Sequence, residues 1–425
     1  MRPKSISVSD HQAVLVIYAL NSGFLKSDFY LVQQTLAKGR RLFTLFTSID
    51  EKFHAKLRRT VSNAYAMSTL VQFEQYIDST TTAFLDQMKQ RFVDRPRISC
   101  NFSTWLQWYA FDVIGELTFS KPLGFIEQGR DIEGIIGSIE KMLDYAAVVG
   151  QWPFLDNIFL KNPIRIMLSK YGLINANTFM VDFARKRLSE RLDTVSGVAK
   201  KSPDMDSYVR NDFLSRFLAA HEKDSEFITN DRVLALTVAN IFAGSDTTAI
   251  SLRAVFYFLL KNPITMQKLL DELFEQRRTG NFKRSDGLVD WNEVRELPYL
   301  SAVIQEALRR HPAVGLTLER VTPPQGSTVC EQFIPSGTII GCNAWAIHRN
   351  ARIFGPRTDE FRPERWIDCT KERRRLMDNS LFTFGAGSRT CIGKNISLLE
   401  MYKFVPAVLM AFEVSGRIFA LKFRR

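Results

Sequence analysis

One segment constrains the fold of this chain more than any other: an apolar stretch with helical pattern, from Val233 to Leu260. Asn230 or Asp231 is a natural helix N-cap before it, and Asn262-Pro263 stops the pattern behind it. A helix of about 30 residues would be ~45 Å long, enough to cross a whole domain. Polar and charged residues interrupt its middle: Ser245, Asp246, Thr247, Thr248 and Arg253. They favour a buried helix of a soluble fold over a membrane span.

The rest of the chain predicts more helices than strands. Apolar residues recur at helical spacing in five further regions before and after this stretch. These are Phe53 to Gln90, Trp105 to Leu117, Ile132 to Val149, Phe179 to Leu192 and Gly393 to Phe412. Shorter helices are expected near Ile264 to Thr279 and Tyr299 to Arg310, and a small hairpin from Thr328 to Ile334 and Gly337 to Cys342. The expected fold is therefore mainly α with a minor β portion, with residues 1–425 in a single domain.

Composition narrows the possible classes of function. Lys and Arg number 57 and Asp and Glu 45, a net charge of +12, but no basic stripe is interleaved with aromatics, so nucleic acid is not an expected partner. The basic run at Lys371, Arg373, Arg374 and Arg375 is interpreted as a solvated loop. The 33 Phe residues suit either a large apolar core alone or a core that also holds an apolar ligand. Five widely spaced Cys argue against a disulfide framework and against a zinc site.

The sharpest chemistry lies in the segment Phe384-Gly-Ala-Gly-Ser-Arg-Thr-Cys391-Ile-Gly393. Glycines let the backbone fold closely around the sulfur, so that N–H groups can point at it. Cys391 also precedes a helix, whose N-terminal partial positive charge favours a thiolate, and Arg389 adds a fixed cation. Such a thiolate suits a metal ligand. The alternative is a buried Cys that acts only as a small hydrophobe in a turn.

This segment closely resembles the haem-binding loop of the cytochrome P450 superfamily, matched here by Phe384, Gly387, Arg389, Cys391 and Gly393. The resemblance implies the P450 fold, a triangular helical prism with a long central helix over the haem. It also implies haem b as cofactor, with Cys391 as the axial iron ligand that favours O–O cleavage. Arg389 would pair with a haem propionate.

A second constellation combines Glu306-Ala-Leu-Arg309 with the later segment from Phe361 to Trp366. On a helix, Glu306 and Arg309 share a face, so they could form an ordinary surface salt bridge. The family has a similar Glu-x-x-Arg helix and a later Pro-x-Arg segment, in which one buried carboxylate is shared by two guanidiniums. The resemblance therefore assigns to Glu306, Arg309 and Arg365 a structural role in positioning the Cys loop.

A third constellation is Ala243-Gly-Ser-Asp246-Thr247-Thr248, midway along the long helix. Gly and β-branched Thr are poor choices for the middle of a helix. The Thr247 hydroxyl can donate to the carbonyl of Ala243, which would open the helix and leave a groove. The segment looks like the oxygen-activation motif of the family, in which Thr247 orients bound oxygen and Asp246 supplies protons. The alternative is a polar kink in a packed helix.

The pair His54 and Arg58 lies four residues apart, so both side chains point the same way from a helix. The family often places an aromatic or His residue four positions before an Arg, both reaching a haem propionate. A charged helix start is an equally good explanation.

The resemblance implies a monooxygenase that inserts one oxygen atom from O₂ into a small apolar substrate, with electrons from NADPH delivered by NADPH-cytochrome P450 reductase. The sequence near Glu400 is most similar to that of fungal secondary-metabolism members of the pisatin demethylase type. Two alternatives stay open: a haem-thiolate peroxygenase or isomerase, and a truncated non-catalytic haem-binding remnant.

The two ends of the chain depart from the family pattern. The usual N-terminal anchor and first sheet are expected to be absent, and Gly416 to Arg425 does not look like the final hairpin of the family. The family implies the cytosolic face of the endoplasmic reticulum, but with no transmembrane anchor in this chain the mode of membrane association is left open.

Overall fold

The computed structural model describes residues 4–95, 99–175, 178–195, 212–415 and 420–423. Its helices are α1 (His11–Ile17), α2 (Phe29–Val32), α3 (Glu51–Val61), α4 (Met67–Leu70), α5 (Glu74–Met88), α6 (Phe102–Phe119), α7 (Phe125–Gln128), α8 (Ile135–Val149), α9 (Pro163–Lys170), α10 (Phe179–Val195), α11 (Phe213–Lys223), α12 (Asn230–Lys261), α13 (Pro263–Arg278), α14 (Trp291–Val294), α15 (Pro298–Arg310), α16 (Ala344–Ile347), α17 (Ala351–Phe354), α18 (Lys371–Ser380) and α19 (Lys394–Ala411). Its strands are β1 (Ser5–Val8), β2 (Leu25–Lys26), β3 (Leu36–Ala37), β4 (Arg40–Arg41), β5 (Arg320–Val321), β6 (Ser327–Val329), β7 (Gln332–Ile334), β8 (Ile339–Cys342), β9 (Phe412–Ser415) and β10 (Ala420–Phe423). The predicted fold class, mainly helical with little sheet and one long helix, is confirmed.

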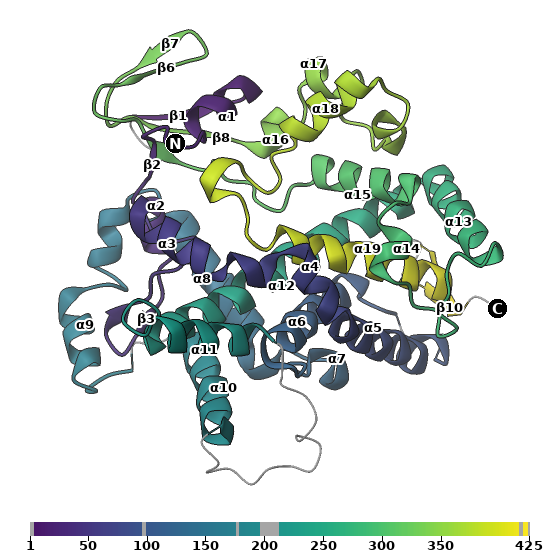
Figure 1. Ribbon diagram of the computed structural model, residues 1–425, viewed down its shortest axis with the longest axis horizontal. Coiled ribbons are helices and arrows are strands. Elements are labelled where there is room, and N and C mark those ends of the chain that lie inside the picture. The colour runs from purple at the N-terminus through teal and green to yellow at the C-terminus, as the bar shows by residue number, and fades with distance from the viewer. Residues whose placement is uncertain (1–3, 96–98, 176–177, 196–211, 416–419, 424–425) are drawn as a thin grey trace.

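The long helix α12 runs through the middle of the helical body (Figure 1). It packs against α6 over most of their shared length, and also against α10, α11, α15 and α19. Its N-cap is Thr229, whose hydroxyl accepts from the N–H of Arg232, one residue before the predicted caps. Among the described residues α12 alone is long and apolar enough to cross a bilayer, and 61% of its most apolar window is buried in the protein.

The core around α12 is rich in aromatic rings, as the many Phe residues predict. Tyr109 of α6 stacks on Phe404 of α19 with ring centroids 3.9 Å apart, and Phe256 of α12 lies edge-on to the same Phe404. Burying such rings removes large apolar areas from water, the main favourable term in folding. The three longest elements of the core are thereby fixed against one another.

The four-stranded sheet and the pair of β6 and β7 lie above the helical body with α1 and α16–α18 (Figure 1). Four strands pair in the order β1-β8-β5-β2, with β1 parallel to β8. The expectation that the first sheet is absent is therefore wrong, because Ser5–Val8 supplies its edge strand. This edge was not foreseen because a four-residue strand has little pattern of its own and is formed only by pairing with distant Ile339–Cys342.

The expected hairpin has a different turn. Strands β6 and β7 are joined at Cys330 and Glu331, whose φ angles of 47° and 65° are those of a two-residue hairpin turn. Neither residue is one that such turns favour. For this reason the sequence predicted the turn of the hairpin at Pro335-Ser336-Gly337 instead. The strand after that Pro-Gly turn, β8, joins the four-stranded sheet.

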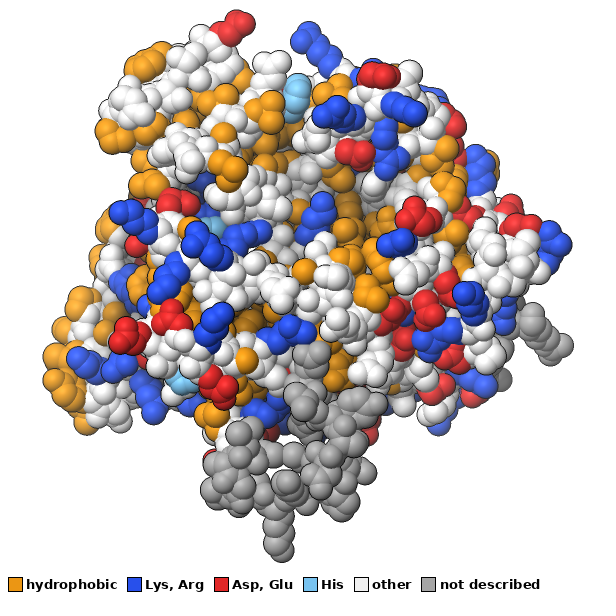
Figure 2. All heavy atoms as spheres, in the orientation of Figure 1, with side chains coloured by type: hydrophobic (Ala, Val, Ile, Leu, Met, Phe, Trp, Pro, Cys, Tyr) orange, Lys and Arg blue, Asp and Glu red, His pale blue; other side chains and the backbone are white. Residues whose placement is uncertain are grey.

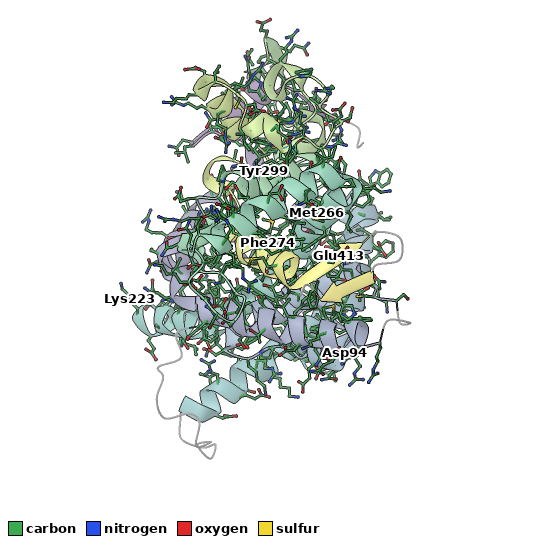
Figure 3. All side chains as sticks on the ribbon, turned by 90° about the vertical axis from the view of Figure 1, so that its right-hand side faces the viewer. Asp94, Lys223, Met266, Phe274, Tyr299 and Glu413 are labelled. Atoms are coloured by element: carbon green, nitrogen blue, oxygen red, sulfur yellow. The ribbon has the colours of Figure 1, made fainter. Side chains whose placement is uncertain are left out.

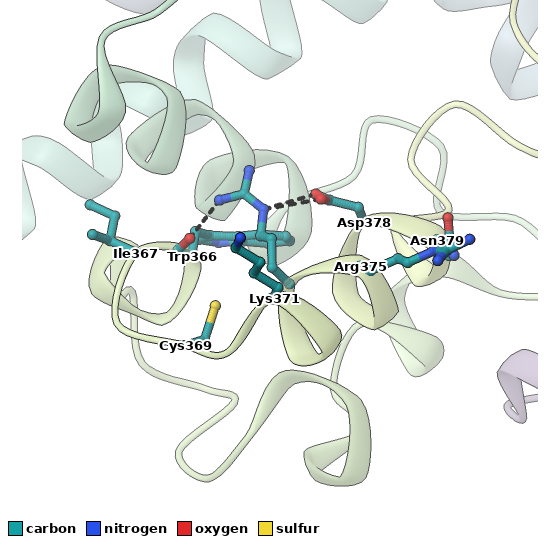
Figure 4. Close-up of a pocket in the computed structure, with 8 residues that line it drawn as sticks. Trp366, Ile367, Cys369, Lys371, Arg375, Asp378 and Asn379 are labelled. Carbon is teal, nitrogen blue, oxygen red and sulfur yellow. Dashed lines mark hydrogen bonds and ion pairs between the residues drawn. The ribbon is translucent and has the colours of Figure 1, made fainter.

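Two further expectations are corrected. The strands Phe412–Ser415 and Ala420–Phe423 form an antiparallel pair, so strand pairing does occur near the end of the described chain. β10 contacts the π-helical segment Lys89–Val93, and Figure 3 labels Glu413 of β9 and Asp94, which follows that segment. The basic run from Lys371 is not a loop but the first turns of α18, begun by Thr370 as N-cap. There Arg374 donates to the Trp366 carbonyl and pairs with Asp378 at 3.0 Å (Figure 4).

Candidate active site

Cys391 sits between a short turn at Gly387–Arg389 and the first residue of α19. Its N–H donates to the carbonyl of Phe384 at 2.9 Å, which closes the loop that the sequence pattern predicts. Gly387 has a φ of 65°, and a Cβ there would collide with the main-chain carbonyl of Tyr18. A side chain at this position is therefore excluded both by its backbone conformation and by the N-terminal segment packed on it.

The Cys391 thiol is open to solvent but has protein close around it. Its side chain is exposed, yet surrounding protein is dense enough for burial to raise the pKa of the thiol. The N–H groups of Gly393 and Lys394 and the charge of Arg58 act in the opposite direction on this pKa. The expected N–H groups do face the sulfur, although they do not outweigh burial. A metal ion would deprotonate such a thiol outright.

One face of α12 is turned toward this sulfur. Tyr65, whose pKa responds to the charge of Cys391, donates its hydroxyl to Asn240 of α12 at 2.5 Å. Ala243 and Thr247 follow Asn240 by three and seven residues and so share its face. Both are exposed although α12 is otherwise a core helix. The helix therefore presents a short open stretch on the side of the thiol.

The hydrogen bond that was predicted to open the helix at this stretch is present, but α12 itself is continuous through it. The Thr247 hydroxyl donates to the carbonyl of Ala243 at 2.7 Å. Gly244 lies where α12 approaches α6, and a Cβ there would press on the side chain of Ile114. Asp246 points toward α6, where it accepts from Gln107 at 3.1 Å. The acid and the alcohol are thus neighbours in sequence but face different directions.

A group of basic side chains lines a cavity beside the Cys loop. His54 and Arg58 of α3 lie in it on the same side, as predicted, together with Arg389 and Arg320 of β5. Arg58 donates to the Thr390 carbonyl at 2.7 Å and so touches the residue before Cys391. These four residues are called the basic cluster below.

The basic cluster carries more positive charge than ion pairs within the described part of the chain neutralise. Arg389 pairs with Glu51 at 2.7 Å, whereas the hydrogen bonds of Arg58 and Arg320 go to backbone carbonyls and to the Tyr30 hydroxyl. Burial, and then the charges of Arg389 and other nearby cations, lower the pKa of His54 from 6.5 to about 3. An anion placed there would relieve this repulsion.

Glu306, Arg309 and Arg365 form the predicted buried triad. The carboxylate accepts twice from Arg309 at 2.8 Å and once from Arg365 at 2.9 Å. Trp366 also donates to it through Nε1 at 2.8 Å, a partner that the sequence did not suggest. Burial by itself raises the pKa of Glu306, but the hydrogen bonds and charges of the two Arg outweigh it and lower the pKa.

A short chain of hydrogen bonds connects the triad to the Cys loop through His348. His348 Nδ1 bonds the Arg309 carbonyl at 3.0 Å, and its Nε2 accepts from the N–H of Phe382 at 2.8 Å. Next to it, the Thr383 hydroxyl donates to the Leu308 carbonyl at 3.0 Å. Phe382 and Thr383 immediately precede the loop of Cys391. The position of that loop is therefore tied to the triad helix α15.

Sequence reasoning missed four residues of this arrangement: Tyr65, Arg320, His348 and Trp366. Trp366 stands next to Arg365, and His348 lies in the segment Asn343 to Asn350, which also resembles the family. Neither residue had been given a role, and Tyr65 and Arg320 come from segments far from the motifs that they support. Pairing of distant strands and helices, not spacing along the chain, brings these two to the site.

Comparison with known proteins agrees with this geometry. The family model for cytochrome P450 matches residues 5–417. The chain is a cytochrome P450. It is 43% identical to a cytochrome P450 monooxygenase of Aspergillus terreus over 413 residues, which is 97% of this chain and 82% of that protein. It is 40% identical to the cytochrome P450 monooxygenase cicH of Emericella nidulans, covering 97% of this chain and 79% of cicH. It is thus a P450 monooxygenase enzyme.

The residues of this P450 fit the haem group of its family. Cys391 offers an exposed sulfur, and Gly385 and Gly387 keep side chains out of the loop around it. The basic cluster offers unbalanced positive charge of the kind that two propionate carboxylates would neutralise. A flat apolar group with two acidic arms suits both features together.

Proposed function

We propose that this P450 holds haem b with Cys391 as the axial iron ligand and with its propionates directed to His54, Arg58, Arg320 and Arg389. The single observation that supports this best is the exposed sulfur of Cys391, which lies close enough to Arg58 of the basic cluster and to Tyr65, the partner of Asn240 on α12, for their charges to interact. Phe384, Gly387 and Gly393 would shape the loop around the ligand sulfur.

When bound, the haem would supply the activation of O₂ with two electrons, so that one oxygen atom enters the substrate and the other leaves as water. The chain's own residues would do the rest. Cys391 would provide the thiolate, held by the N–H groups of Gly393 and Lys394. The Thr247 hydroxyl would present a hydrogen-bonding group at the open face of α12, and Asp246 would exchange a proton with solvent behind it.

Electrons would come from NADPH through NADPH-cytochrome P450 reductase. The net charge of +12 suits an acidic electron donor. The pair Asp246 and Thr247 favours this source over the peroxygenase or isomerase alternative, because neither of those reactions needs protons delivered to bound O₂.

The substrate is proposed to be a small apolar molecule of fungal secondary metabolism, and the enzyme to be of the pisatin demethylase type. The fungal origin of the relatives supports the pathway class. The stretches expected to form the pocket, near Phe29 to Phe46, after Trp152, Ala239 to Thr247 and Ala313 to Leu318, contain many apolar residues.

We also propose that the protein lies on the cytosolic face of the endoplasmic reticulum. Exposed apolar side chains gather between residues 148 and 174, over α9 and its neighbours at the lower left of Figure 2. The most exposed are Val148, Trp152, Phe154, Ile158, Phe159, Ile164, Met167, Tyr171 and Leu173. The single acid of this segment, Asp156, is buried against Lys161, while Arg165 and Lys170 are exposed. An apolar face with basic residues and no exposed acid suits an anionic membrane surface.

One expression experiment tests these proposals. The chain is produced in yeast with a reductase, and the cells are separated into membrane and soluble fractions. We expect a reduced carbon monoxide difference spectrum with the thiolate-shifted Soret band, found in the membrane fraction. Cys391→Ala should abolish that band, whereas Cys369→Ala, at the surface near α18, should keep it. A thiolate band that survives Cys391→Ala would overturn the ligand assignment, and a band only in the soluble fraction would overturn the location.

A further inference from the structure

We propose that Gln107 and Arg253 are positioning residues for Asp246, and that Gln107 acts as a spacer between the two charged groups. This inference rests on the proposed function, since it concerns the acid that would exchange protons near Thr247. Gln107 belongs to α6, whereas Asp246 and Arg253 both belong to α12. Seven residues separate the two, so they lie on the same face of the helix.

A single side-chain amide bridges the two charges. Gln107 Nε2 donates to Asp246 Oδ1 at 3.1 Å, and Gln107 Oε1 accepts from an Arg253 guanidinium nitrogen at 2.9 Å. The two charges fix the orientation of the amide, because the reverse orientation would set its oxygen against the carboxylate and its NH₂ against the guanidinium.

Arg253 of α12 is held in place by a second hydrogen bond to α6, the helix of Gln107. Its Nε donates to the Ser103 carbonyl at 3.0 Å, one turn before Gln107 on α6. The guanidinium therefore cannot approach Asp246 without giving up a hydrogen bond to α6. The result is a fixed sequence of carboxylate, amide and guanidinium across the interface between α6 and α12.

This arrangement leaves part of the carboxylate free. The hydrogen bond from Gln107 goes to Oδ1, while Asp246 Oδ2 accepts none from the described residues and is reached by solvent. A direct ion pair with Arg253 would instead engage both oxygens, as Arg and carboxylates commonly do. Two residues seven apart are ~10.5 Å apart along a helix, a span that these two side chains together can bridge. Without Gln107, Asp246 would be drawn into that pair.

The spacer therefore keeps Asp246 able to exchange protons. Asp246 faces α6 while Thr247 faces the open side of α12, so a proton would reach Asp246 from solvent on the α6 side. The carboxylate takes up one proton from solvent water at Oδ2 and later releases that proton to a water molecule, which restores the carboxylate. No electron and no further reactant is needed for this step.

The test uses the holoenzyme with a reductase, NADPH and O₂, and no added substrate. The share of electrons released as hydrogen peroxide, rather than used to form water, reports on proton delivery. We expect Gln107→Leu to raise the ratio of peroxide to water at least threefold, in the same direction as Asp246→Asn, with an unchanged carbon monoxide difference spectrum. Gln87→Leu is the matched control, because Gln87 of α5 also accepts from an arginine, Arg91, but lies elsewhere.

An infrared measurement on the same proteins separates positioning from a general structural effect. The carboxylate band of Asp246 is identified by subtraction of the Asp246→Asn spectrum. It should shift in Gln107→Leu and in Gln107→Glu, which keeps the acceptor for Arg253 but loses the donor to Asp246. It should not shift in Gln87→Leu.

An unshifted band together with a wild-type peroxide ratio in both Gln107 variants would overturn the proposal. A wild-type ratio in Asp246→Asn would instead overturn the role of Asp246 itself. If wild-type holoprotein lacked the thiolate-shifted band, that result would contradict the proposed function itself and not the role of Gln107.

Discussion

The protein contains two clusters of buried or half-buried arginines, which differ in how far nearby anions balance their charge. In the triad, the Glu306 carboxylate receives three hydrogen bonds from the side chains of Arg309 and Arg365, a fourth from Trp366 and a fifth from the N–H of Arg362. In the basic cluster, Glu51 pairs with Arg389, but Arg58 and Arg320 are bonded only to uncharged oxygens among the described residues. The first cluster is closed, while the second lines a cavity.

This difference separates structure from binding. A buried ion pair with all of its hydrogen bonds made fixes the chain but has nothing left to offer a ligand. Buried cations of one sign repel one another and become favourable only when an anion arrives. The triad should therefore matter to folding with or without cofactor, and the basic cluster should matter mainly to haem.

The largest effect is expected for Glu306→Ala. It leaves Arg309 and Arg365 buried without their anion, which costs about 3–5 kcal/mol in the free energy of unfolding. Urea unfolding of the apoprotein should show the loss, and little holoprotein should accumulate. Glu275→Ala removes an exposed partner of Arg278 and should leave unfolding unchanged. A Glu306→Ala protein of normal stability would remove the contrast between the two clusters.

A smaller and more specific effect is expected for Arg58→Ala. Loss of one charge-assisted contact to a propionate should weaken haem binding by about 1.5–3 kcal/mol. Transfer of haem to apomyoglobin measures this, and the apoprotein should unfold at nearly the wild-type urea concentration. Arg278→Ala, at the exposed pair, serves as control. If Arg58→Ala destabilised the apoprotein as strongly as it weakened haem retention, the cluster would be structural.

The smallest effect concerns pH and compares two buried histidines. Burial lowers the pKa of His348, beside the triad, and of His54, in the basic cluster, from 6.5 to about 3. Between pH 6.5 and about pH 3 the unfolded chain binds protons at these histidines that the folded chain does not bind. The free energy of unfolding therefore falls as the pH is lowered through this range. For His348 the slope is at most about 1.4 kcal/mol per pH unit.

Haem should change the contribution of His54 to the pH dependence of unfolding, but not that of His348. Propionates near His54 would raise its pKa, so hemin should reduce the acid sensitivity of urea unfolding between pH 7 and pH 5. His54→Gln should remove this difference between apoprotein and holoprotein, and His348→Gln should preserve it. Equal behaviour of the two variants would mean that His54 does not sense the propionates.

Sequence reasoning worked where pattern and structure are local. The ends of α12, the bond from Thr247 to the Ala243 carbonyl, and the shared faces of Glu306 with Arg309 and of His54 with Arg58 all follow from helical spacing. It was wrong where pairing or capping decides. The turn at Cys330 and Glu331 uses residues that such turns seldom favour, and Ser5–Val8 is a strand only because β8 lies beside it.

By itself, the sequence determined the long helix, the loop of Cys391 and the family, because each is written in consecutive residues whose backbone preferences and spacing act over a few turns of chain. The tertiary structure alone decided that Arg320 joins the basic cluster, that Tyr65 connects the thiol to α12, and that His348 ties the triad to the loop. Those contacts join segments up to hundreds of residues apart, and the burial that makes them favourable exists only after the core has packed.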